Sequence, residues 1–155
     1  MVINSLLRRI SIVSIVVAAG LTAWACDERL STLAGPTPNL EPTFSSVQSQ
    51  IFEAADSSGR KACVDCHTNV GRSPSAGLNL THDMAYDQIV NVAARNKAGA
   101  VRVIPGDAEN SYLIHKMEGL PGIAGIRMPS GSSPYLTDGQ ILIVKRWIAT
   151  GAPRN

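Results

Sequence analysis

Apolar residues recur with helical spacing in several parts of the chain, and no segment alternates convincingly with the two-residue period of a strand. The first pattern predicts a helix over about 44–57, stopped by Gly59, with apolar positions at Phe44, Val47, Ile51, Phe52 and Ala55. The later patterns predict a helical turn from about Ala62 and helices from Thr81 to about Arg95, Asn110 to Met117 and Thr137 to Gly151. Thr137 and Gln140 fit a capping box. The glycine- and proline-rich stretch 119–134 predicts loop. The expected fold class is all-α, with three to five short helices and long loops.

The first 25 residues have the order of a secretory signal peptide. Arg8 and Arg9 precede an apolar run from Ile10 to Ala19, and Ala23-Trp24-Ala25 ends the segment. A membrane span is the weaker alternative, because the run is shorter than the ~20 apolar residues that a span needs. We therefore expect residues 1–25 to be a signal peptide and the protein to be exported.

Cys26 follows the expected cleavage site directly. Ordinary cleavage would leave a free thiol there, whereas a lipoprotein pathway would leave a lipidated cysteine. The segment Leu21 to Cys26 resembles a lipobox, and a lone cysteine beside an apolar signal is otherwise hard to explain. We favour lipidation of Cys26, followed by a proline-rich extended tether over 26–43 and a folded domain over 44–155.

Composition narrows the classes of function. The chain has 155 residues, enough for one domain, and 14 basic against 12 acidic residues. Arg8 and Arg9 account for the whole excess, since 14 − 2 = 12 basic residues remain after the signal. No run of one charge sign is present, so we expect no nucleic-acid partner.

The motif that carries chemistry is Cys63-Val64-Asp65-Cys66-His67, the C-x-x-C-H signature of covalent haem attachment. On a helical turn its two cysteines and its histidine share a face. Both thiols then reach one edge of a porphyrin and the imidazole reaches its iron. Three alternatives are a thioredoxin-like pair, which needs an absent βαβ setting, a plain disulfide, and a zinc site that borrows His82 or His115. Export favours one covalently bound haem c with His67 as an axial ligand.

Together with other segments, the motif resembles a class I cytochrome c, and more narrowly the monohaem modules of planctomycete-type cytochromes. The matching segments are Cys63 to His67, Gly77 to Leu80, Pro105 to Asp107 with Ser111 to Leu113, Arg127 to Pro129, and Gln140 to Ala152. The resemblance implies a cytochrome c fold around one haem. Such modules often adjoin larger enzyme domains, and here the module follows a lipoprotein-like leader.

The sixth ligand of the iron has five candidates: Met84, Met117, Met128, His82 and His115. Met128 is favoured because it lies in the loop predicted to wrap the haem and because Met128-Pro129 matches the distal Met-Pro of the family. Met84 and Met117 fall in predicted helices, where methionine is usually core. Arg102 and Arg127 are candidate partners of the haem propionates, and Phe52 and Trp147 are expected to pack near the haem edge.

His/Met ligation predicts one-electron transfer between redox partner proteins, on the periplasmic or cell-surface side of a bacterial membrane and anchored there by the lipid. We therefore expect no catalytic activity. The alternatives are a haem subunit of a larger oxidoreductase complex, a ligand sensor, or a peroxidase-type enzyme with an open distal site. His115 and Glu118 are neighbours in sequence, but nothing in the pattern places them over the iron.

Overall fold

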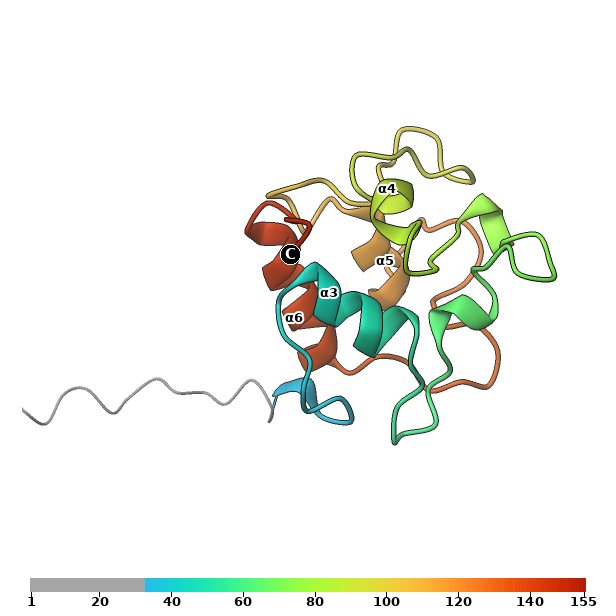
Figure 1. The fold of residues 1–155 in the computed structure, drawn as a ribbon. Coiled ribbons are helices and arrows are strands. Elements are labelled where there is room, and N and C mark those ends of the chain that lie inside the picture. Colours follow the sequence, from blue (N-terminus) through green and yellow to red (C-terminus); the bar gives the residue numbers. More distant parts are fainter. Residues whose placement is uncertain (1–32) are drawn as a thin grey trace, which may run out of the picture.

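The computed structural model describes residues 33–155 (Figure 1). The predicted signal peptide over 1–25 and Cys26 lie outside the described residues. The helical elements are α3 (Phe44–Val47), the π-helix η1 (Gln48–Phe52), the 3-10 helices η2 (Cys63–Asp65) and η3 (Ser75–Gly77), α4 (Ala85–Ile89), α5 (Tyr112–Glu118) and α6 (Asp138–Ala149). Residues 33–155 form no strand beyond three isolated bridges. The described chain is therefore helical with long loops, as predicted.

The core lies where α3 and η1 meet α5 and α6. Trp147 of α6 is fully buried, and its ring centroid lies 5.7 Å from that of Phe44 in α3. Figure 1 shows α3 lying across α6, with α5 behind them. The last residue closes this corner, because Asn155 accepts hydrogen bonds from the backbone amides of Phe44 and Ser45.

The first predicted helix is shorter than expected. It begins at Phe44 as predicted, but it widens into η1 and ends at Phe52, and Ala55 is exposed. The carbonyls of Gln50, Ile51 and Ala54 accept hydrogen bonds from the buried guanidinium of Arg60. Those carbonyls are therefore capped from outside the helix, which explains its early end.

The helix predicted from Thr81 to Arg95 is also too long. Only Ala85–Ile89 is helical, and Asn91 then takes a left-handed backbone conformation with φ 59°. Residues 90–93 pair with residues 101–103, through isolated bridges from Val90 to Val103 and from Ala93 to Val101. Pairing with a distant segment replaces the local helix there.

The two C-terminal helices agree with the prediction. α5 ends at Glu118 and is capped by Gly119, whose left-handed φ of 75° is favourable for glycine. α6 begins with the predicted capping box: Gln140 N donates to Thr137 Oγ1 at 3.2 Å, and Thr137 N donates to Gln140 Oε1 at 2.8 Å. The stretch 119–134 is loop, as expected.

Residues 33–43 pack on the domain, which corrects the predicted tether over 26–43 for its described part. Ala34 and Leu40 are buried in the core, and Thr37 Oγ1 accepts a hydrogen bond from Gln140 Nε2 at 3.0 Å. A Cβ on Gly139 would lie 1.9 Å from Leu33 O, so only glycine permits this approach. The packed domain therefore begins before residue 44.

Candidate functional site

The C-x-x-C-H motif occupies a tight turn beside η1. Cys63 begins η2, and His67 N donates to Cys63 O at 2.9 Å, which brings the histidine back over the first cysteine. Both thiols are free, and Cys66 is exposed whereas Cys63 is half-buried. Cys63 Sγ donates to Ile51 O at 3.3 Å, and burial raises the pKa of this thiol to about 11. The two cysteines therefore differ in environment.

One ring nitrogen of His67 makes a hydrogen bond, and the other can ligate a metal. Its Nδ1 lies 3.0 Å from Ser75 O, and because a carbonyl only accepts, Nδ1 carries the proton. Burial lowers the pKa of His67, although its backbone partners oppose the effect, so the ring is neutral near pH 7. Nε2 then keeps a free lone pair, as a metal-ligating histidine requires.

Cys63, Cys66, His67 and Met128 all line one cavity of about 480 Å³. This volume falls within the ~300–1,000 Å³ typical of cofactor and ligand sites. Apolar side chains dominate its wall, including Phe52, Leu78, Leu80, Ile89, Leu113 and Leu136. The structure therefore brings together four predicted site residues that span positions 63 to 128.

Of the rival sixth ligands, only Met117 shares this cavity with Met128. Met84 is 42% exposed, and the ring of His82 lies 3.8 Å from Glu53 at the surface. The ring of His115 is turned to Glu109 O, 2.6 Å from its Nε2. Neither of the two histidines that the zinc alternative could borrow therefore lines the cavity with the motif.

Only one of the two arginines predicted as propionate partners, Arg102 and Arg127, lines the cavity. Arg102 lines the cavity, and its Nη1 donates to Gln88 O at 2.6 Å. Arg127 does not line it; its guanidinium stacks 4.2 Å from the ring centroid of Tyr135. Arg95, which the sequence did not single out, is a second arginine in the wall. Of the two residues predicted to pack near the haem edge, Phe52 lines the cavity, whereas Trp147 is buried in the core and does not line it.

A buried ion pair lies just before the motif, and no local pattern in the sequence predicts it. The side chains of Arg60 and Asp56 are each 1% exposed and lie 2.9 Å apart. All five N–H groups of the guanidinium have acceptors: Asp56 and the carbonyls of Gln50, Ile51, Ala54 and Lys61. Arg60 therefore joins the end of η1 to the start of the motif.

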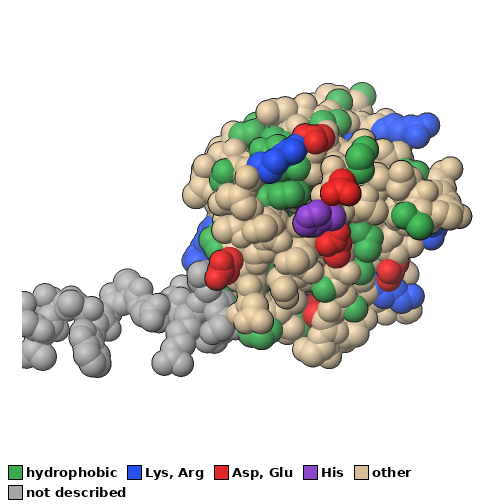
Figure 2. Space-filling view, in the orientation of Figure 1, with side chains coloured by type: hydrophobic (Ala, Val, Ile, Leu, Met, Phe, Trp, Pro, Cys, Tyr) green, Lys and Arg blue, Asp and Glu red, His purple; other side chains and the backbone are tan. Residues whose placement is uncertain are grey.

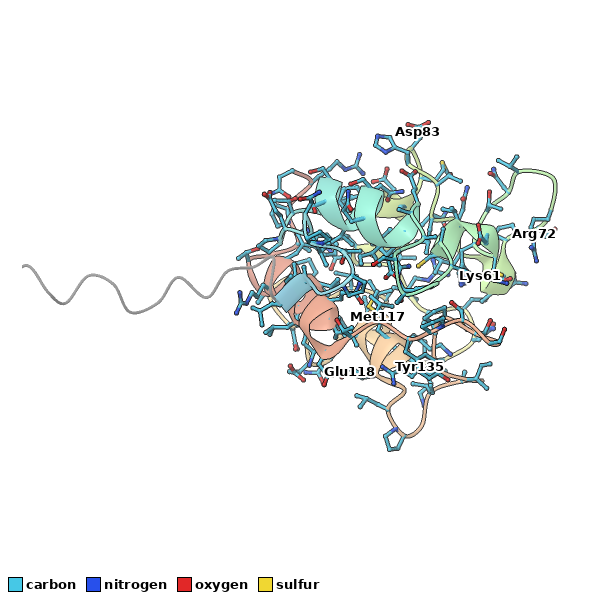
Figure 3. The ribbon with its side chains drawn as sticks, turned by 90° about the horizontal axis from the view of Figure 1, so that it is seen from below. Lys61, Arg72, Asp83, Met117, Glu118 and Tyr135 are labelled. Carbon is cyan, nitrogen blue, oxygen red and sulfur yellow. The ribbon has the colours of Figure 1, made fainter. Side chains whose placement is uncertain are left out.

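Surface charge outside the site is mixed. On the face in Figure 2, acidic side chains lie above and below a histidine, and lysine and arginine lie mostly toward the edges. Figure 3 shows Lys61 and Arg72 together beside the attachment turn, and Tyr135 beside α5.

Among residues 33–155, no helix has the length and apolar character needed to cross a membrane. Comparison with known proteins adds no family: no family model, no curated protein and no solved structure matches the chain.

Proposed function

We propose that this protein is a monohaem c-type cytochrome with a cytochrome c-like fold that transfers single electrons. The observation that carries the proposal is the convergence of Cys63, Cys66, His67 and Met128 on one largely apolar cavity. Haem c would be held by thioethers to the two cysteines and supplies a one-electron ferric/ferrous couple.

The residues of the cavity fit that group chemically. Neutral His67 keeps a lone pair on Nε2, and Met128 offers a thioether, so the pair matches His/Met ligation. Arg102 and Arg95 provide positive charge for the propionates within an otherwise apolar wall. Methionine ligation favours ferrous iron and leaves no open position for a substrate.

The peroxidase-type alternative gains no support from the acid–base candidates. The ring of His115 faces Glu109 O, and Glu118 pairs with Lys145 at 2.8 Å, so neither side chain lines the cavity. Electron transfer between partner proteins therefore remains the favoured function, either as a free carrier or as a subunit of a complex. Export, the lipid on Cys26 and a periplasmic or cell-surface location are further parts of this proposal.

The test uses protein matured in a host that attaches haem c. We expect one covalently bound haem by mass spectrometry and, in the ferric protein, the weak red charge-transfer band of methionine ligation. Met128→Ala should abolish the band. Met117→Leu, which changes the other methionine of the cavity, should retain it. Bound haem with a high-spin spectrum and no such band would contradict His/Met ligation and favour an open-site enzyme or sensor.

A further inference from the structure

The loop that carries Met128 is attached to α5 by side chains as well as by backbone. Lys116 Nζ donates to Ala124 O at 2.9 Å and also to Ile126 O, and Ala124 N donates to Tyr112 Oη at 2.8 Å. We call these three hydrogen bonds the α5 clasp. They hold residues 124–126, which end two positions before Met128.

Backbone contacts continue the attachment up to the methionine. Met128 N donates to Lys116 O at 2.8 Å, and Arg127 Nε donates to Met117 O at 2.7 Å. The stem of Arg127 passes so close to Gly119 that a Cβ there would lie 2.8 Å from Arg127 Cδ. The loop therefore returns along the last turn of α5 and presents Met128 beside it.

Lys116 is placed unlike an ordinary surface lysine. It lines the cavity together with Tyr112, Ala124, Ile126 and Met128. Within residues 33–155 no ion pair joins it to a carboxylate; its recorded partners are the two loop carbonyls. Hydrogen bonds from a charged donor are roughly twice as strong as neutral ones, so the ammonium suits a loop that must be held in one place.

From this geometry we infer that Lys116, assisted by Tyr112, is a positioning residue that holds the Met128 loop against α5 and so keeps the methionine at the iron. The inference rests on the proposed haem function. When the clasp is lost, the loop can move away from α5. An external ligand then displaces Met128 from the iron more easily.

The first test compares Lys116→Met with Lys61→Met in holoprotein. Both variants remove one positive charge from the cavity wall and keep a long apolar stem, but only Lys116 holds the loop through Nζ. Imidazole, which competes with methionine for ferric haem, is titrated into each. We expect at least tenfold tighter imidazole binding in Lys116→Met and a change of less than twofold in Lys61→Met. Equal affinities in the two variants would overturn the inference.

The second test measures the mobility of the loop itself and does not depend on a ligand of the iron. Amide hydrogen exchange of Ala124 and Met128 is measured by NMR against amides within α6 as reference. Lys116→Met should speed exchange of both loop amides at least tenfold, and Lys116→Arg, whose guanidinium can donate to both loop carbonyls, should restore most of the protection. Unchanged exchange in Lys116→Met would overturn the clasp.

Should Lys116→Met fail to fold, Tyr112→Phe decides instead, because it removes only the acceptor for Ala124 N; faster exchange at Ala124 supports the clasp, and unchanged exchange refutes it. If the purified protein carries no covalent haem, the proposed function fails, whereas the exchange experiment still decides whether the clasp exists.

Discussion

Replacement of Arg60 by methionine should strongly destabilise the protein. The variant keeps a long apolar side chain but removes all five N–H donors, and so leaves the buried carboxylate of Asp56 without its ion-pair partner. Three backbone carbonyls at the end of the first helical segment lose their cap at the same time.

The expected loss in free energy of unfolding is about 3–5 kcal/mol, the usual cost of removing one member of a buried ion pair. A small domain is stable by only about 5–15 kcal/mol, so this is a large share. The control is Arg72→Met, because Arg72 is exposed and makes one hydrogen bond, to Asp65 O at 3.0 Å. A surface change of this kind should stay within about 0.5 kcal/mol.

The assay is urea unfolding of the purified protein at pH 7, followed by circular dichroism. A double variant, Arg60→Met with Asp56→Leu, should recover part of the loss, because no buried charge is then left unpaired. A loss below about 1 kcal/mol in Arg60→Met would refute the reasoning, since it would mean that Asp56 finds water or another partner. If Arg60→Met does not accumulate, Arg60→Lys is measured instead. An intermediate loss in free energy of unfolding is expected, because lysine keeps the positive charge but lacks the planar set of five N–H donors.

Three further predictions concern acid stability, the N-terminal segment and the redox potential. Burial alone would raise the pKa of Asp56, but hydrogen bonds from Ser58, Gln140 and Arg60 lower it from 3.8 to about 2. Its stabilisation, about 2 kcal/mol, is thus present above pH 4 and lost as pH falls through 2, so urea midpoints of Asp56→Asn should depend less on pH over that window. Gly139→Ala should release residues 33–40 from the surface of the domain, because its Cβ would lie 1.9 Å from Leu33 O. Limited proteolysis should then cut the variant before residue 40, and a variant that stays uncut would contradict the close approach. If the cavity holds haem as proposed, Arg102→Gln should lower the midpoint potential by tens of millivolts in a redox titration, because a cation beside the haem would favour ferrous iron. Arg146→Gln, outside the cavity wall, should leave the potential nearly unchanged, and equal shifts would argue against a local effect.

Local sequence patterns predicted the features that depend on neighbours in the chain. The capping box at Thr137 and Gln140 and the end of α5 at Gly119 rest on contacts within a few residues, and both are found. The spacing of Cys63, Cys66 and His67 likewise placed the motif on one helical turn.

Features that depend on distant partners could not be predicted in this way. The first helix ends early because Arg60 takes its carbonyls, and the helix from Thr81 ends early because Val90 pairs with Val103. Nothing local marks Arg60 or Lys116 as different from a solvated cation. The loop context and the neighbouring proline favour Met128 as a ligand, but that it lines the same cavity as His67 is known only from the tertiary structure.

The packed segment 33–40 limits how far the domain can travel if Cys26 carries a lipid. Between Cys26 and Leu33 lie seven residue steps (33 − 26 = 7), which span at most about 25 Å when fully extended. A domain of this size has a radius of gyration of about 14 Å, so its permitted height above the bilayer is about one molecular diameter. Encounter with a partner would then be a search in two dimensions along the membrane, and a donor or acceptor would have to present its own redox centre within that thin layer.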